Sequence, residues 1–208
     1  MIQKRFLQAL VLPLAFLSSN QLSAQAFSEG TNAINVGIGI GGFGYNYISR
    51  GSAGKYIVSP TFSFAYDRGV KKLGPDVLGI GGLVGFKTVK YEYTNSNSFQ
   101  TIKYDRRWSN IMLGARATYH LNWWHGVDEL DLYGGVLLGF NIGTYTSNTT
   151  RTINGVTSDY DDGYSSASSF PIYGAFAGVR YLFTDHFGVY AEAGYTVTAL
   201  NAGLTFTF

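Results

Sequence analysis

The chain has no cysteine, little charge and, beyond residue 26, no long hydrophobic run. Without cysteine it can form no disulfide, no thiolate metal site and no cysteine nucleophile. Only 13% of its 208 residues are charged, about half the share of an average soluble domain, so charge could not cover an ordinary globule. The apolar content of 46% argues against disorder. A transmembrane helix needs about 20 consecutive apolar residues, so the sequence predicts none after residue 26.

The first 26 residues have the three parts of a secretory signal peptide. Lys4 and Arg5 supply the positive start, and residues 6–17 form the apolar run. The segment ends with Ala24 and Ala26 in the A-x-A pattern of a cleavage site. The alternative, a membrane anchor, would need a longer apolar run.

Removal of this segment sets the domain boundaries and changes the net charge. We predict a signal peptide over residues 1–26 and one mature domain over 27–208. The chain has 15 basic and 13 acidic residues. Because Lys4 and Arg5 are two of the basic ones and residues 1–26 hold no acid, the mature chain has 13 of each. A neutral chain has no general attraction for phosphate backbones, so we expect no nucleic-acid partner.

Apolar residues recur at every second position along most of the mature chain. Ile34, Val36 and Ile38, for example, alternate with Asn35 and Gly37. This period is typical of β-strands, whose successive side chains point to opposite faces of a sheet. We predict an all-β fold with eight strands, near residues 33–43, 56–67, 77–93, 107–122, 130–146, 170–183, 187–196 and 200–208. A ten-strand fold, in which 147–169 forms another hairpin, stays open.

The composition of the two strand faces favours a membrane barrel over a soluble β-sandwich. One face carries mostly Gly, Ser, Thr, Asn and Tyr, and the other is nearly free of charge. Lipid contact requires this second kind of face, because Arg or Lys at the bilayer midplane costs about 2–4 kcal/mol. Lipid also tolerates no open sheet edge. The sequence therefore predicts an eight-stranded, antiparallel, up-and-down transmembrane β-barrel.

Aromatic residues gather near the predicted strand ends, as they do at the two interfaces of a membrane barrel. One set is Tyr119, Trp123, Trp124, Phe183 and Phe187, and the other is Tyr91, Tyr93, Trp108 and Tyr145. Loop lengths predict the orientation, since outer loops are long and periplasmic turns are short. With the N-terminus in the periplasm, the outer loops are 44–55, 94–106, 147–169 and 197–199, and the inner turns are 68–76, 123–129 and 184–186.

Two segments resemble the small outer-membrane β-barrel family that includes the OmpX, OmpW and OmpA-barrel types. They are residues 178–195, with the sequence GVRYLFTDHFGVYAEAGY, and the terminal LTFTF. The resemblance implies export to the bacterial outer membrane, contact with its lipids and lipopolysaccharide, and recognition by the barrel assembly machinery. Leu204, Phe206 and Phe208 would form the C-terminal assembly signal.

Three charged residues are predicted to point into the lumen: Arg116, Arg180 and Glu192. Arg180 and Glu192 lie roughly diagonal across a turn, within reach of each other. They form either a gate for a narrow channel or an ion pair that neutralises charge in a plugged barrel. The interior of an eight-stranded barrel is just wide enough for side chains to fill it, which favours the ion pair.

No residue pattern indicates catalysis, a cofactor or a metal. The three histidines, at 120, 125 and 186, fall at predicted periplasmic ends, away from any outer-face nucleophile. The acidic segment 159–163 offers oxygen ligands for calcium, but it lacks the spacing of an EF-hand loop. We interpret it as a solvated loop. We therefore expect no enzyme activity, no cofactor and no metal.

Two functions from different classes remain open at this point. The first is a structural or interaction role, in which the outer loops meet a surface or host ligand or the lipopolysaccharide layer. The second is a narrow, porin-like channel for small or hydrophobic solutes. Small residues along the predicted lumen favour the channel, whereas the Arg and Glu side chains with Tyr133, Tyr190 and Phe176 favour a plug.

Overall fold

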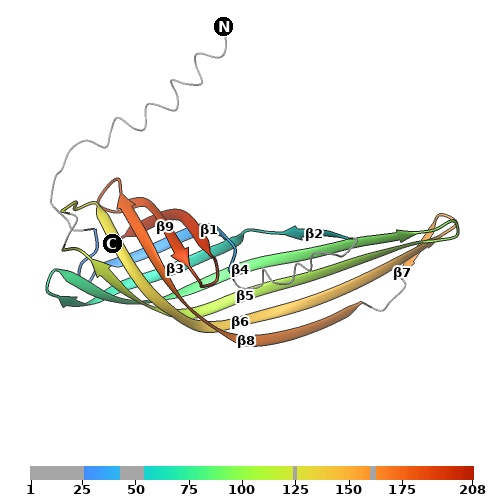
Figure 1. Cartoon of the computed structure of the whole chain (residues 1–208), viewed down its shortest axis with the longest axis horizontal. Helices are drawn as coiled ribbons and strands as arrows, with labels where there is room; N and C mark the ends of the chain where they lie inside the picture. Colours follow the sequence, from blue (N-terminus) through green and yellow to red (C-terminus); the bar gives the residue numbers. More distant parts are fainter. Residues whose placement is uncertain (1–25, 43–53, 124–125, 160–162) are drawn as a thin grey trace, which may run out of the picture.

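The chain folds into one closed antiparallel sheet, shown in Figure 1. The computed structural model describes residues 26–42, 54–123, 126–159 and 163–208. Its strands are β1 (Asn32–Ile40), β2 (Lys55–Val58), β3 (Thr61–Leu73), β4 (Asp76–Ser96), β5 (Thr101–Leu121), β6 (Leu130–Ile153), β7 (Val156–Asp159), β8 (Tyr164–Leu182), β9 (Phe187–Gly194) and β10 (Leu200–Thr207). No helix among the described residues is long and apolar enough to cross a membrane.

Eight of these strands form the ring, in the order β1, β3, β4, β5, β6, β8, β9 and β10. β1 closes it, because it pairs with β3 on one side and with β10 on the other. The predicted eight-stranded barrel is confirmed. Within the described residues, β2 and β7 add to the edges of β4 and β6 without entering the ring. The hairpin considered over 147–169 is therefore a continuation of β6 and β8 beyond the ring.

Two predicted outer loops are wrong, because the strands run on through them. β4 and β5 continue as a regular ladder from Val77–His120 to Ser96–Thr101, which covers most of the predicted loop 94–106. β6 likewise continues to Ile153 and turns at Asn154-Gly155, where both residues have positive φ. Asn-Gly is the preferred sequence of such a two-residue hairpin turn, so the sequence held a signal for this hairpin.

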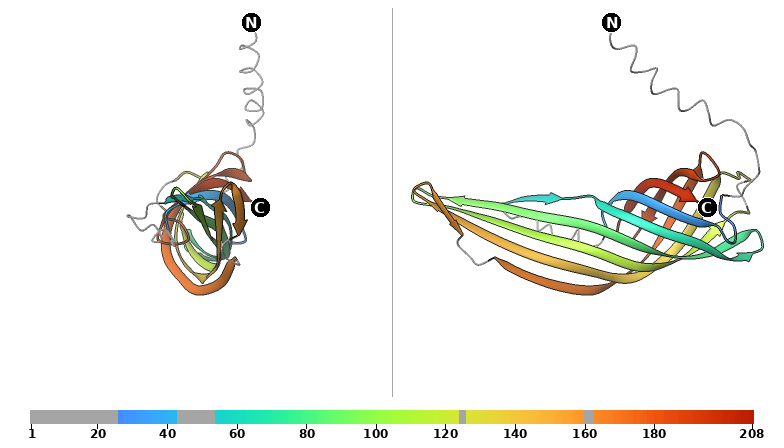
Figure 2. Two further views of the ribbon diagram at one scale, coloured as in Figure 1. Left: turned by 90° about the vertical axis from the view of Figure 1, so that its right-hand side faces the viewer. Right: turned by 180° about the vertical axis from the view of Figure 1, so that it is seen from behind.

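The long strands project beyond the ring on one side only, as Figures 1 and 2 show. We call this part the strand extension and define it as residues 88–109, 144–159 and 163–167, with β2 along its edge. Thr88, Ser109, Thr144 and Ala167 face one another in register and mark its base. A strand rises about 3.3 Å per residue, so the extension continues β4, β5 and β6 by roughly 30 Å and β8 by roughly 15 Å.

The outward face of the ring is apolar and solvent-exposed. Large apolar side chains on each long strand, such as Phe64, Val84, Leu113 and Leu138, are more than two-fifths exposed. The residues between them on the same strands are buried or are glycines. This alternation is the pattern that the sequence predicts for a wall between lipid and a filled lumen.

One of the two predicted aromatic rims lies on the opposite face of the sheet. Tyr119, Trp123, Phe183 and Phe187 are exposed near the turns at one end, as predicted; Trp124 lies outside the described residues. The other set instead lies on the same face of the sheet as buried residues such as Val89 and Met112, because side chains alternate along each strand. This set is Tyr91, Tyr93, Trp108 and Tyr145. Their side chains therefore belong to the inner face of the extension, and their assignment to a membrane interface is wrong.

The described start of the chain and its C-terminus lie at the same end of the barrel. Asn32 and Phe208 exchange backbone hydrogen bonds of 2.9 Å in both directions. The two-residue turn at Gly74-Pro75, with Gly74 at φ +65°, lies at this end too. The strand extension lies at the other end (Figure 1). An even number of ring strands places both termini on one side, so insertion from the periplasm would direct the extension outward.

Close approach of neighbouring strands makes a testable distinction between two adjacent glycines. A Cβ at Gly81 would overlap the carbonyl oxygen of Tyr66, whereas a Cβ at Gly82 would meet only Gly114 O, at 3.5 Å. We predict that Gly81→Ala lowers the free energy of unfolding by about 1–3 kcal/mol, the range of overpacking. Gly82→Ala, the control, should leave it nearly unchanged. Urea unfolding of the refolded barrel in detergent measures both, and equal losses would contradict the prediction.

Candidate functional site: the closed lumen and the strand extension

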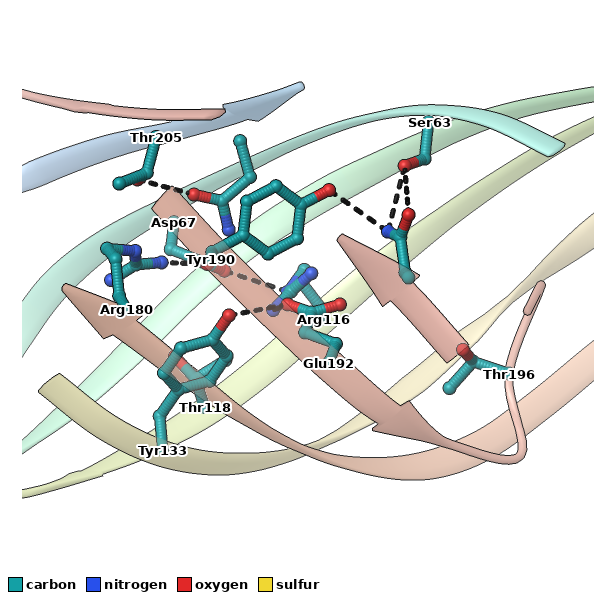
Figure 3. Close-up of polar contacts among 12 residues, drawn as sticks. Ser63, Asp67, Arg116, Thr118, Tyr133, Arg180, Tyr190, Glu192, Thr196 and Thr205 are labelled. Carbon is teal, nitrogen blue, oxygen red and sulfur yellow. Dashed lines mark hydrogen bonds and ion pairs between the residues drawn. The ribbon is translucent and has the colours of Figure 1, made fainter. Parts of the chain in front are cut away.

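A buried network of charged side chains crosses the lumen, and Figure 3 shows its centre. Arg116 comes from β5, Asp67 from β3 and Glu192 from β9. Arg116 Nη2 donates to Glu192 Oε1 at 2.7 Å, and Arg116 Nε lies 2.9 Å from Asp67 Oδ1. Tyr133 Oη donates to the same Glu192 oxygen at 2.8 Å. With Tyr133 on β6, the network thus ties four separate strands together across the interior.

A second arginine extends this network toward the end with the termini. Arg180 on β8 pairs with Asp131 on β6 at 2.5 Å and with Asp67 at 3.3 Å. Asp67 therefore bridges the two arginines. His120 Nδ1 lies 2.8 Å from the other oxygen of Asp131. The side chains of both arginines, both aspartates and His120 are fully shielded from solvent.

The three lumen residues singled out from the sequence lie in this one network, but with different partners from those expected. Arg116 pairs with Glu192, while Arg180 pairs with Asp131 and Asp67. The expected diagonal contact between Arg180 and Glu192 is wrong. Glu192 stands opposite Gly178 in the β8–β9 ladder, and its carboxylate reaches across the lumen to β5 instead. Asp67 is not among the lumen charges singled out from the sequence, although its alternation in β3 with the outward-facing Tyr66 and Arg68 places it on the polar inner face.

Aromatic rings surround the two guanidinium groups. Arg116 lies 4.3 Å from the ring centre of Phe176, and Arg180 lies 4.8 Å from that of Tyr133. Phe27, wholly buried, stacks on His120 at 3.7 Å. Such contacts between cations and ring faces are favourable, most of all where water is excluded. Phe27, the predicted first residue of the mature chain, thus covers the network at the end with the termini.

An apolar layer fills the lumen above the charged network, toward the extension. Its members are inward-facing side chains from five strands and one loop: Ala65, Leu83, Met112, Leu137, Ile172 and Val197, with Phe170 packed against them. Val197 belongs to the segment between β9 and β10, which turns into the barrel so that residues 196–198 are buried. The interior is therefore crossed by two successive layers of side chains, as expected for a barrel of eight strands.

A hydrogen-bonded chain within the network resembles a catalytic triad in its residue types. Thr118 Oγ1 lies 3.0 Å from His120 Nε2, and His120 Nδ1 contacts Asp131. All three residues are buried, and Phe27 covers the imidazole. A nucleophile must reach its substrate, and this threonine is only 2% exposed. The arrangement therefore serves to satisfy buried polar atoms.

The remaining residues singled out from the sequence lie apart from the network. Leu204, Phe206 and Phe208 project outward and are about half exposed. Ala26 is buried and donates its N–H to Asp128 O, while Ala24 lies outside the described residues, as do Asp161 and Asp162 of the acidic segment. Among the described residues, no group of three or more His, Cys, Asp or Glu could hold a metal ion.

The inner face of the strand extension carries a ladder of aromatic rings. Ring centres are 4.6 Å apart for Tyr56 and Tyr91, 5.8 Å for Tyr93 and Tyr104, and 5.1 Å for Trp108 and Tyr145. These are cross-strand pairs in the β2–β4, β4–β5 and β5–β6 ladders. Cross-strand aromatic pairs stabilise a sheet, which helps the extension to hold its shape without a closed ring.

The outer face of the extension carries charges that neutralise one another. Lys90 Nζ lies 2.6 Å from Glu92 Oε1 and 2.9 Å from Asp105 Oδ2. Hydrogen bonds to these two carboxylates raise the pKa of Lys90, and the bond from Lys90 lowers the pKa of Glu92. Below this level the outward-facing residues pass through Thr88, Ser109 and Thr144 to the apolar side chains of the ring, so these ion pairs lie outside the apolar band.

Comparison with known proteins agrees with this architecture. A family model described as "Outer membrane protein beta-barrel domain" matches residues 9–207. No curated protein matches the sequence. Solved structures that match include Ail of Yersinia pestis (14% identity, TM-score 0.40, 87% of this chain and 100% of that chain). Another is the N-terminal β-barrel domain of Pseudomonas aeruginosa OprF (16% identity, TM-score 0.39, 86% of this chain and 98% of that chain). Ail also matches in a complex with the heparin analogue sucrose octasulfate (16% identity, TM-score 0.40, 87% of this chain and 100% of that chain).

The charged network makes a quantitative prediction about stability. Arg116→Met removes the cation between Asp67 and Glu192, which leaves Asp67 with Arg180 alone and Glu192 with only the hydroxyl of Tyr133 inside the barrel. We expect the free energy of unfolding to fall by about 3–5 kcal/mol, the cost of breaking a buried ion pair from one side. Arg107→Met, the same change on the exposed outer face of the extension, should cost less than about 0.5 kcal/mol. Urea unfolding in detergent compares the two, and similar losses would rule out a structural role for the network.

Proposed function

This chain belongs to the outer membrane protein β-barrel domain family, and from that premise we propose that it is a closed barrel that binds ligands at the cell surface through its strand extension. The observation that carries the proposal is the division of the molecule into two parts. The ring has a filled lumen, and the extension presents a broad sheet beyond it. A filled lumen supports anchoring more than transport, and a projecting sheet supports recognition.

The filled lumen is the reason to favour binding over a porin-like channel. The charged layer around Asp67 and the apolar layer around Met112 lie in series, and both are buried. A solute would have to displace both layers, including arginine side chains held by carboxylates on several strands. Breaking such pairs is costly. The ion pairs among Arg116, Arg180 and Glu192 are therefore proposed as structure and not as a gate.

The remaining parts of the proposal follow from the family and the sequence. Residues 1–26 would act as a signal peptide cleaved after Ala26, leaving residues 27–208 as the barrel domain. Leu204, Phe206 and Phe208, which project from the last strand, would be read by the assembly machinery during insertion. Lipids and lipopolysaccharide would contact the apolar band. The protein would have no enzymatic activity, since its triad-like residues are sealed inside.

Surface display of the extension can be tested by labelling, because the natural chain has no cysteine. Phe99 lies at the tip of the β4–β5 hairpin and is 83% exposed. We expect Phe99→Cys to react with a maleimide on a bulky polyethylene glycol in intact cells. Asp185→Cys, in the exposed turn between β8 and β9, should react only after the cells are broken. The reverse pattern would contradict the orientation and with it the proposed function.

Closure of the lumen can be tested by single-channel recording of the refolded mature chain in a planar bilayer. We expect no discrete openings, because two layers of side chains cross the interior. The compact band of the folded barrel on an unboiled SDS gel serves as the folding control. Openings in the wild type that change in Arg180→Ala or Glu192→Ala would instead establish the channel alternative.

A further inference from the structure

The two faces of the strand extension differ in charge. On the outer face, the four cations Lys55, Lys90, Lys103 and Arg107 are offset in large part by the three carboxylates Glu92, Asp105 and Asp159. On the inner face, the described residues include two cations, Arg106 and Arg151, and no carboxylate. Strand parity fixes these assignments, because the β4–β5, β5–β6 and β6–β8 ladders run through the extension without a register shift. The inner face is therefore positive, although the charge of the mature chain is balanced.

The inner-face side chains form successive rungs across the sheet. The first rung consists of Val89, Trp108, Tyr145 and Ser166, and the second of Tyr91, Arg106, Ser147 and Tyr164. The third consists of Tyr93, Tyr104 and Thr149. The fourth consists of Asn95, Ile102, Arg151 and Ser158. Arg106 and Arg151 are thus two rungs apart, or roughly 13 Å at the rise of a β-strand. Aromatic rings lie level with Arg106 and on the rungs on either side of it.

This combination of side chains matches a particular ligand chemistry. Tyr and Trp provide flat apolar faces with a polar edge, which suit the alternating CH and OH surface of a sugar ring. Ser, Thr and Asn at the same level can exchange hydrogen bonds with hydroxyl groups. The guanidinium group of arginine is suited to paired hydrogen bonds with carboxylate, sulfate or phosphate oxygens. A face whose described charges are both positive selects for a negatively charged ligand.

We propose that the inner face of the strand extension binds a polysaccharide chain that carries carboxylate or sulfate groups. The sugar rings stack along the ladder of Tyr91, Tyr93, Tyr104 and Trp108, and the anionic groups meet Arg106 and Arg151. The length of the ladder suits several sugar units in a row. This inference rests on the proposed function, because it requires the extension to be displayed outside the cell.

The geometry favours a polysaccharide over the lipid surface as the anionic partner. Lipid headgroups would flank the outer face, where Lys90 is already neutralised by Glu92 and Asp105. The inner face turns toward the barrel axis and away from the surrounding lipid. It also carries few aliphatic side chains, which an apolar lipid tail or a peptide anchor would need. The shared feature of the inner-face rungs is rings with hydroxyl groups.

Two adjacent arginines provide a matched test of this site. Arg106 and Arg107 are consecutive, are both exposed and lie on opposite faces of β5. With the full mature chain refolded in detergent, we expect binding of dextran sulfate and of polygalacturonate, followed by the fluorescence anisotropy of the labelled polysaccharide. Arg106→Gln should weaken this binding about tenfold, the effect of losing one charge-assisted hydrogen bond. Arg107→Gln should change it less than about twofold. Equal losses would show non-specific attraction and overturn the proposal.

The aromatic part of the site is tested separately from its charge. Tyr104→Ser keeps a hydroxyl group and removes the ring, and we expect it to weaken binding of both polysaccharides about tenfold. Polyglutamate, which is anionic but has no sugar ring, should bind the wild type far more weakly than dextran sulfate. Equal binding of polyglutamate would overturn the assignment to a polysaccharide. Each variant must give the compact band on an unboiled gel.

The result also separates this inference from the proposed function. Suppose that neither polysaccharide binds, while the Phe99→Cys variant is labelled in intact cells and the barrel shows no channel openings. The ligand class is then wrong, and surface display of the extension is confirmed. If vesicles containing lipopolysaccharide bind the inner face and neither polysaccharide does, the lipid surface is the partner and the inference fails. If the Phe99→Cys variant is not labelled in intact cells, the proposed function fails first.

Discussion

Closure of the sheet by β1 and β10 is the constraint on which the rest of this molecule depends. A hydrocarbon environment offers no partner to an open strand edge, so each backbone donor and acceptor in the ring must pair with a neighbouring strand. β1 meets this demand with β3 on one side and β10 on the other. A ring of eight strands then fixes the width of the interior, which side chains are just able to fill.

The narrow interior explains why Arg116 and Arg180 lie in a network and not as isolated charges. Arg116 and Arg180 are fully shielded from solvent, and an unpaired cation there would be very costly. Asp67 bridges the two, while Glu192 and Asp131 each satisfy one arginine from a different strand. The same groups that neutralise one another also join opposite walls. The same ion pairs therefore both neutralise the buried charges and block the lumen.

The strand extension lies under a different constraint, because water can satisfy its open edges. Four long strands leave the ring while β1, β3, β9 and β10 stop, and the sheet becomes open on one side (Figure 2). Its two faces are then free to differ. The outer face pairs its charges around Lys90, whereas the inner face gathers aromatic rings and arginines. Recognition thus falls to the part of the molecule that the membrane does not constrain.

The sequence by itself determined that there are eight ring strands, that they close into a barrel and that its two faces differ in polarity, because a period of two and a shortage of charge are local properties of the chain. It did not determine how far the strands run beyond the ring. It also placed Arg116, Arg180 and Glu192 in the lumen by parity. Their partners came only from the tertiary structure, since Glu192 reaches Arg116 across the interior and Asp67 joins strands far apart in sequence. The inner position of Tyr91 and Trp108 likewise depended on an unbroken register beyond the apolar band. Alternation along a strand predicts which residues share a face of the sheet. Which of those residues touch across the lumen depends on how the sheet closes into the ring.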